Sequence, residues 1–253
     1  MTASSAIADD LTIAGVEPFS ACDWPGHLAA VVFLQGCPWQ CTYCHNVSII
    51  DPRAPGQVTW SAVRELLSAR RGLLDAVVFS GGEPTRQAGL ADAMRQVKAM
   101  SFAVGLHTGG AYPRRLAEVL PLVDWVGLDI KAPVGKYSAI TGVANSADPA
   151  VVSLHHVLDA GVPVQVRTTL DPTILNADDV AEIRRTVTAL GVTDVVVQEV
   201  RTDGASEAFV ENLTRYRRAH PAASSASAPP CGSRRQPTQS ADCPGQLPSR
   251  KTG

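Results

Sequence analysis

The chain has 253 residues, of which 45% are hydrophobic and 18% charged, and its formal net charge is -2. This balance is typical of a globular protein with a sizeable core, and it lacks the basic excess expected of a nucleic-acid-binding protein. No apolar run approaches the ~20 residues that span a bilayer, and the first ten residues carry no signal-peptide pattern. We therefore expect a cytoplasmic protein that binds neither nucleic acid nor membrane.

The two ends of the chain differ in composition from its middle. Residues 220–253 are rich in Pro, Ser and Ala and contain six of the chain's 18 prolines, but they have almost no large apolar residues. Such a segment cannot bury enough surface to offset the entropy lost on ordering it. We therefore predict a flexible N-terminus at residues 1–10, a globular body at residues 11–219 and a disordered tail at residues 220–253.

In the body, short β-branched runs alternate with helical patterns. The expected strands are residues 29–35, 75–80, 102–107, 124–130, 162–170 and 193–200, and the expected helices are residues 60–71, 87–100, 113–120, 149–160, 177–190 and 206–218. Several strands are apolar almost throughout, which is typical of parallel strands covered on both faces. Six strand–helix units predict an α/β fold with a parallel sheet and right-handed crossovers. Periodicity alone leaves open whether the sheet is doubly wound or a partial barrel.

Polar and glycine-rich segments follow the expected strands. They are residues 36–46 after the first strand, 81–84 after the second, 107–110 at the end of the third, 129–131 at the end of the fourth and 167–169 in the fifth. In either architecture the carboxyl ends of parallel strands meet at one rim, where α/β proteins bind their ligands. The sequence therefore predicts a functional site at this rim.

Three of the six cysteines, Cys37, Cys41 and Cys44, lie close together after the first strand. In a reducing compartment, clustered thiols are more typical of metal ligands than of disulfides. Iron–sulfur clusters usually take four cysteines, so three leave one iron open to a substrate or cofactor. A Cys3His zinc site with His45 and the c-type haem pattern of residues 41–45 also match. Adjacent side chains rarely converge on one ion, and haem attachment leaves Cys37 unused, so we favour a [4Fe–4S] cluster.

These residues resemble the radical S-adenosylmethionine (SAM) superfamily. The spacing Cys-x3-Cys-x2-Cys, with Tyr43 before the last cysteine, is similar to its signature, and residues 81–84 match its Gly-Gly-Glu-Pro motif. A narrower similarity, over roughly residues 13–200, is to anaerobic ribonucleoside-triphosphate reductase activating proteins, which are glycyl-radical enzyme activases. It is carried by residues 18–26, 35–37, 43–46, 79–85, 129–133, 136–137 and 167–169. Pyruvate formate-lyase activating enzymes share the overall plan.

The resemblance implies a fold, two cofactors and a reaction. The fold is a partial (βα)6 TIM-like barrel of parallel strands with outer helices. The cofactors are a [4Fe–4S] cluster on the three cysteines and SAM, which is cleaved reductively to methionine and a 5′-deoxyadenosyl radical. That radical removes a hydrogen atom from a glycine of a partner enzyme, here anaerobic ribonucleoside-triphosphate reductase. The implied electron donor is a flavodoxin- or ferredoxin-like protein.

The resemblance also implies which residues contact SAM. The turn at residues 81–83 receives the methionyl amine, Lys131 meets the carboxylate, and Tyr43 lies by the adenine. Arg167 meets either the carboxylate or the ribose. The full expected set is Tyr43, Gly81, Gly82, Glu83, Thr108, Asp129, Lys131 and Arg167. From the residues alone, a simple tight turn, two surface cations and a tyrosine packed beneath the loop stay open as alternatives.

One short stretch departs from the activases. They usually have an acidic residue before the position of Thr108 and an asparagine after it, whereas this chain has His107 and Gly109. His107 cannot supply a carboxylate, and the departure therefore bears on the monovalent-cation site that some activases have.

Two further functions stay open. The first is a radical SAM enzyme that acts on a small molecule, similar to 7-carboxy-7-deazaguanine synthase. The second is a non-catalytic carrier of a metal or a cluster, which has no need of a Gly-Gly-Glu-Pro turn. In the tail, Cys231 and Cys243 are 12 positions apart and form a possible metal-binding pair.

Overall fold

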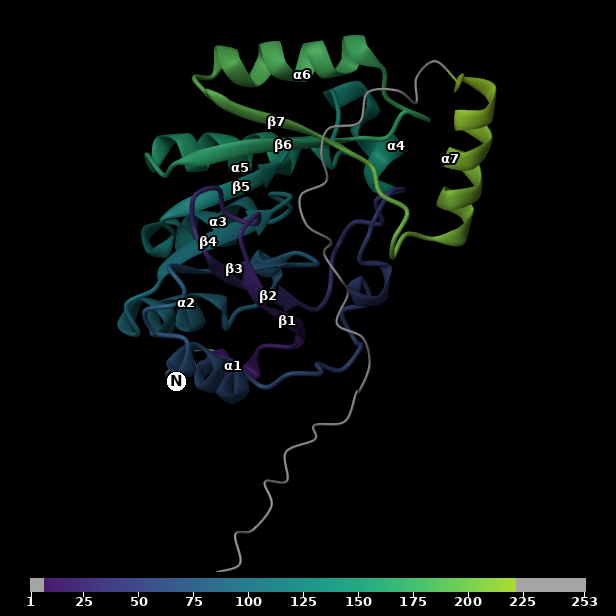
Figure 1. Ribbon diagram of the computed structural model, residues 1–253. Helices are drawn as coiled ribbons and strands as arrows, with labels where there is room; N and C mark the ends of the chain where they lie inside the picture. Colours follow the sequence, from purple (N-terminus) through teal and green to yellow (C-terminus); the bar gives the residue numbers. More distant parts are fainter. Residues whose placement is uncertain (1–6, 222–253) are drawn as a thin grey trace, which may run out of the picture.

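One sheet organises the fold (Figure 1). The computed structural model describes residues 7–221, and in this part of the chain seven strands lie side by side in sequence order. The strands are β1 (Ile13–Ser20), β2 (Ala29–Leu34), β3 (Ala76–Gly81), β4 (Ala103–Thr108), β5 (Trp125–Asp129), β6 (Val164–Leu170) and β7 (Asp194–Glu199). β1 is antiparallel to β2, whereas β2 to β7 are all parallel. The carboxyl ends of six strands therefore meet at one rim.

Helices follow each parallel strand and surround the sheet. Figure 1 shows them arranged from α1 at the bottom to α6 at the top. The α-helices are α1 (Trp60–Ala69), α2 (Leu90–Ala99), α3 (Pro113–Val119), α4 (Tyr137–Thr141), α5 (Ala147–Asp159), α6 (Ala177–Ala189) and α7 (Glu207–Ala219). The short 3-10 helices are η1 (Ala8–Asp10), η2 (Val47–Ile49), η3 (Pro84–Arg86), η4 (Leu120–Leu122) and η5 (Val134–Lys136). None of the helices within residues 7–221 is long and apolar enough to cross a membrane.

The structure confirms the predicted α/β partial barrel of six strand–helix units. Every expected strand and helix is present, and the ends differ from the expected ones by at most three residues. One strand, β1, and one α-helix, α4, were not predicted, nor were the short 3-10 helices. Gly15 and Pro18 interrupt the strand pattern of β1, and proline is tolerated there because the strand lies at the edge of the sheet. With five residues, α4 is too short for a helical period to show.

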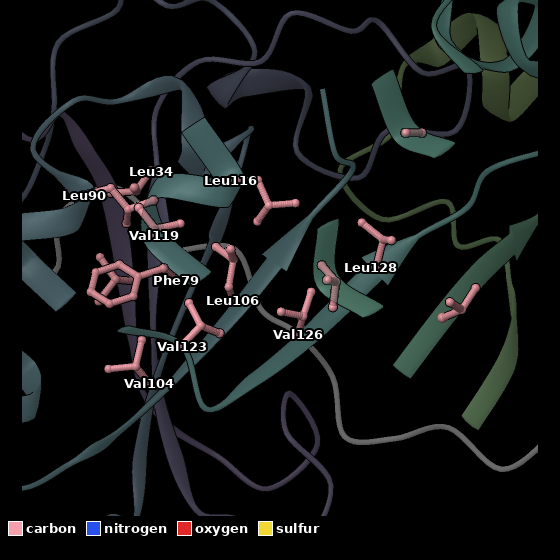
Figure 2. Packing of buried hydrophobic residues seen from close by; sticks show 14 of the residues in the cluster. Leu34, Phe79, Leu90, Val104, Leu106, Leu116, Val119, Val123, Val126 and Leu128 are labelled. Atoms are coloured by element: carbon pink, nitrogen blue, oxygen red, sulfur yellow. The ribbon is translucent and has the colours of Figure 1, made fainter. Parts of the chain in front are cut away.

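One face of the parallel strands forms the main core. Leu34, Phe79, Leu106 and Leu128 come from four successive strands, and all four side chains are fully buried. Figure 2 shows them meeting apolar side chains from the covering helices, such as Leu90. Fully burying a side chain of this size stabilises the fold by about 1.5–3 kcal/mol. This continuous core fixes the positions of the strand ends that carry the polar segments.

The inner face of the sheet carries a second, smaller cluster. Trp24 belongs to the connection between β1 and β2, and its ring stacks on that of Trp125 with 5.4 Å between centroids. A Cβ atom on Gly105 would lie 2.9 Å from the Trp24 ring, so only glycine leaves room for the indole. The connection between β1 and β2 therefore fills the inside of the sheet behind the rim.

The N-terminal residues differ in part from their prediction. Residues 8–10, assigned above to a flexible N-terminus, form η1 against the body. Ala8 is fully buried, and its N–H donates to the carboxylate of Asp92 on α2 at 2.9 Å. Residues 1–6 and 222–253, including Cys231 and Cys243, lie outside the described residues, and the domain boundaries stay predictions.

Candidate active site

The three clustered cysteines lie on the loop between β2 and η2. The loop leaves β2 at Gly36, whose φ of 94° is in the left-handed region that favours glycine. The Cys37 N–H donates to the carbonyl of Ile50 at 3.0 Å, and the Cys44 N–H donates to the carbonyl of Cys41 at 3.1 Å. All three thiols are free and partly buried. The loop therefore places them together at the carboxyl end of β2.

The far side of the cysteine loop is bonded to α4. The N–H of Gln40 donates to the carbonyl of Thr141, and the N–H of Thr42 donates to that of Ile140, both at 2.9 Å. Carbonyls in the last turn of a helix have no partner within the helix, so they are free to accept from the loop. The helix missing from the sequence prediction thus supports the segment that carries the cysteines.

Burial, backbone N–H groups and one cation all act on the protonation of the thiols. Burial raises the pKa of all three, to about 12 for Cys37. The ammonium of Lys131 opposes this rise at Cys37, Cys41 and Cys44. Cysteine binds iron as the thiolate, so iron binding releases a proton from each thiol. Lys131 is the cation placed to favour that release.

The turn after β3 lies directly against the start of the cysteine loop. A Cβ atom on Gly82 would lie 2.3 Å from the carbonyl oxygen of Gly36, and one on Gly81 would lie 2.4 Å from the nitrogen of Leu34. The Glu83 N–H donates to the same Gly36 oxygen at 2.9 Å. The two glycines are therefore required by backbone contact between neighbouring strand ends. Their contact with the methionyl amine stays a prediction.

The carboxylate of Glu83 joins the ends of β3 and β4. It accepts from the N–H and hydroxyl of Thr85 at 3.1 and 2.6 Å, from the Thr108 hydroxyl at 2.8 and 2.9 Å, and from the Gly109 N–H at 3.0 Å. Burial raises the pKa of Glu83, and these donors act against that rise. Because the bonds occupy both oxygens, Glu83 and Thr108 serve to hold the rim, and their contribution to SAM binding stays a prediction.

Replacing Glu83 by glutamine is expected to destabilise the fold by about 1–3 kcal/mol, because it leaves a buried donor without an acceptor. One backbone N–H, of Thr85 or Gly109, meets each carboxylate oxygen. Either orientation of the amide therefore sets its nitrogen against a donor. Urea unfolding of Glu83→Gln measures the loss, with the exposed Glu182→Gln as the matched control. Equal midpoints for the two variants would contradict this account of Glu83.

Three charged side chains meet at the carboxyl ends of β5 and β6. Arg167 donates to one oxygen of Asp129 through Nε at 3.0 Å and Nη2 at 2.9 Å, while Lys131 Nζ reaches the other oxygen at 3.2 Å. Although burial alone would raise it, these two cations hold the pKa of Asp129 well below its usual range. Burial likewise acts against the charge of Lys131, but Asp129 raises the pKa of its ammonium. Asp129 and Lys131 are therefore both charged at neutral pH.

Lys131 connects this charge cluster to the cysteine loop. Its ammonium lies 5.9 Å from the ring centroid of Trp39 and 6.0 Å from that of Tyr43, two aromatic residues of the loop. The Tyr43 ring is only 5% exposed and belongs to the main core, so it packs beneath the loop. Its expected contact with adenine stays a prediction. The cation, the carboxylate and the cysteine loop form one continuous group at the rim.

The two departures from the activases follow from packing. A Cβ atom on Gly109 would lie 2.5 Å from the Trp39 ring, so a larger residue would collide with that indole. The His107 ring points to the inner face, where Nε2 lies 2.7 Å from the carbonyl oxygen of Asp23 and Nδ1 lies 3.3 Å from the Ser80 hydroxyl. His107 and Gly109 therefore both fit the residues that surround them within this chain.

The site also contains residues that the sequence analysis did not single out. They are Trp39, the terminal carbonyls of α4, and Asp171, which accepts from the Thr42 hydroxyl at 3.0 Å. Trp39 could have been noticed in the sequence, because it is an aromatic residue between two of the cysteines. Asp171 directly follows β6, yet no local pattern links it to a loop 129 positions away. The other expected residues are all brought to the same rim.

The donors at this rim fit an iron–sulfur cluster. Thiolates are the ligands that such clusters take, and each thiolate binds its own iron, whereas zinc ligands converge on one ion. The turn at Gly81-Gly82 lies against the backbone of Gly36 and Cys37, at the start of the cysteine loop. The residues present therefore match the cluster and SAM that the resemblance implied.

Comparison with known proteins gives the class of this chain. Residues 31–190 match the Radical SAM superfamily, and the chain belongs to that superfamily. A protein of Methanocaldococcus jannaschii named as a glycyl-radical enzyme activating enzyme is 30% identical over 183 residues, which cover 69% of this chain and 75% of that protein. Pyruvate formate-lyase-activating enzyme of Streptococcus mutans is 27% identical over 64% of this chain and 66% of its own length. Within its superfamily, the chain is a radical SAM enzyme related to glycyl-radical enzyme activases.

Solved structures agree on the fold. Streptococcus suis SuiB bound to S-adenosylmethionine superimposes with a TM-score of 0.56 at 13% identity over 75% of this chain. TYW1 with a lysine-pyruvate adduct bound gives a TM-score of 0.53 at 14% identity, over 76% of this chain and 73% of that one. This chain spans only 46% of the SuiB chain. At such low identity these similarities support the partial barrel alone.

Proposed function

We propose that this chain binds a [4Fe–4S] cluster and SAM at its rim and generates a glycyl radical on a partner enzyme. The observation that carries the proposal is the position of Lys131. Its ammonium lies between the loop of three cysteines and the carboxylate of Asp129, and the Gly81-Gly82 turn borders the same loop. One rim therefore has thiolates that can bind a cluster, a cation that can bind the SAM carboxylate and a glycine turn whose backbone can bind the SAM amine. When bound, the cluster supplies the electron that cleaves SAM.

The residues of this chain have distinct roles in that arrangement. Cys37, Cys41 and Cys44 hold the cluster and leave one of its irons without a protein ligand. Lys131 has hydrogens left beyond its bond to Asp129, and these are available to the SAM carboxylate. Arg167 holds Asp129, so it positions Lys131 and keeps the rim close to neutral. Because the reacting groups are held in fixed places, cleavage proceeds as an intramolecular step.

The partner follows from two sets of similarities. The motifs of the sequence favour anaerobic ribonucleoside-triphosphate reductase, and a flavodoxin- or ferredoxin-like donor would supply the electron. Several relatives are pyruvate formate-lyase activating enzymes, including that of Escherichia coli at 28% identity over 67% of this chain and 72% of its own length. We therefore propose a glycyl-radical enzyme as the partner, with the reductase as the first candidate and a pyruvate formate-lyase as the second.

The test uses the full chain, reconstituted with iron and sulfide under anaerobic conditions. After reduction with SAM present, we expect 5′-deoxyadenosine by liquid chromatography, and a glycyl-radical signal by electron paramagnetic resonance when the correct partner is added. The two candidate partners are tested in parallel. Product without a radical on either partner would favour an enzyme that acts on a small molecule. Bound iron with intact SAM would favour a cluster carrier and overturn the proposal.

A further inference from the structure

A side-chain hydrogen bond joins the segment between Cys41 and Cys44 to a residue outside its own loop. The hydroxyl of Thr42 donates to Oδ2 of Asp171 at 3.0 Å. Asp171 is fully buried and directly follows β6, so the bond joins the loop after β2 to the strand that lies four places away in the sheet. A hydrogen bond to a carboxylate is among the stronger side-chain interactions in proteins.

The rest of Asp171 is fixed by its own turn. Its Oδ1 accepts from the N–H of Thr173 at 3.0 Å and from the Thr173 hydroxyl at 2.7 Å, and its carbonyl accepts from the N–H of Leu175 at 2.8 Å. These bonds leave Oδ2 directed to Thr42. The donors of Thr173 and Leu175 therefore hold Asp171 in place independently of the cysteine loop.

The same strand also orders the charges of the site. Arg167 on β6 holds Asp129, which in turn holds Lys131 beside the aromatic residues of the cysteine loop. β6 and the residue that follows it therefore act on the rim at two points. Arg167 acts through Asp129 on Lys131, and Asp171 binds the cysteine loop itself. A shift of the loop relative to β6 would change the distance between the thiols and Lys131.

We propose that Asp171 is a positioning residue for the iron–sulfur cluster. Through Thr42 it holds the segment between Cys41 and Cys44 in the conformation that binds iron and keeps that segment in register with Lys131. The inference rests on the proposed function, because it assigns Asp171 a role toward the cluster of that function. Asp171 touches neither cluster nor SAM in this role, which it exerts through the Thr42 hydroxyl.

The experiment removes the hydroxyl and then restores it in the full chain. Thr42→Val deletes the donor with little change in volume, Thr42→Ser restores the hydroxyl, and Thr173→Val removes another donor to the same carboxylate without touching the loop. We measure hydrogen exchange of residues 38–44 in the metal-free protein and iron release to a chelator from the reconstituted protein. Thr42→Val is expected to speed both hydrogen exchange and iron release about tenfold, the factor that corresponds to the loss of one hydrogen bond to a carboxylate.

A third readout separates positioning from general stability. We expect Thr42→Val to change the electron paramagnetic resonance spectrum of the reduced cluster on addition of SAM, and Thr42→Ser to match the wild type. Thr173→Val loosens one side of the Asp171 carboxylate but keeps the Thr42 bond, so its effect should be smaller than that of Thr42→Val. Unchanged iron release and spectra in Thr42→Val would overturn the proposal, as would equal effects of Thr173→Val. If the wild type binds iron but leaves SAM intact, the proposed function fails while iron release still decides the role of Asp171. A wild type that takes up no iron overturns both.

Discussion

Cys41→Ala is expected to lose most of its iron and to form no measurable 5′-deoxyadenosine. The cysteine loop supplies three thiolates and contains no fourth cysteine, so loss of one leaves two irons without a cysteine ligand. The effect should exceed the roughly 10–100-fold cost of removing an outer partner of a metal ligand. Iron analysis and liquid chromatography on anaerobically reconstituted protein measure both quantities.

The matched control for this prediction is Cys22→Ala. Cys22 is also a free, partly buried cysteine, but it lies between β1 and β2, with its thiol 3.5 Å from the hydroxyl of Ser20. We expect this variant to keep the iron content and the 5′-deoxyadenosine yield of the wild type. Equal iron loss in both variants, or full iron content in Cys41→Ala, would contradict the assignment of Cys41 as a ligand of the cluster.

The sequence predicted those parts of the fold that repeat. Several of the six parallel strands carry near-continuous apolar runs, as expected where both faces are covered, and each strand is followed by a helical pattern, so their order and ends could be predicted. β1 and α4 lack such a signal, since one is interrupted by Gly15 and Pro18 and the other has only five residues. Short and edge elements depend on the partners they meet, and those partners are set by the tertiary fold.

The candidate site shows the same division between local and long-range information. The cysteines and the Gly-Gly-Glu-Pro turn stand in short motifs, and the rim was predictable because the carboxyl ends of parallel strands meet there. The Thr42–Asp171 bond spans 129 positions, and the fit of Gly109 to Trp39 spans 70 by their numbers, so neither leaves a local pattern. Long-range pairs of this kind decide which of the possible contacts each motif residue makes.

Gly82→Ala is expected to be the most damaging single-methyl change at the rim. Its Cβ atom would lie 2.3 Å from the Gly36 oxygen and 2.6 Å from the Gly36 carbonyl carbon, and both are backbone atoms that cannot rotate away. The end of β3 and the start of the cysteine loop must therefore separate. Overpacking usually costs about 1–3 kcal/mol, and we expect at least the upper value here because backbone has to move. Urea unfolding of the metal-free chain measures the loss.

The comparison that isolates the steric cause is Gly135→Ala, which adds the same methyl group in η5 at the same rim. An added Cβ atom meets nothing within 4 Å there, and neither glycine has the positive φ that would strain alanine. Gly135→Ala should therefore keep the unfolding midpoint and the iron content of the wild type, whereas Gly82→Ala should lose both. If Gly82→Ala kept its iron despite a lower midpoint, contact between the β3 turn and the cysteine loop would matter for stability alone. Loss of iron with the midpoint unchanged would instead place the effect of Gly82 at the cluster itself.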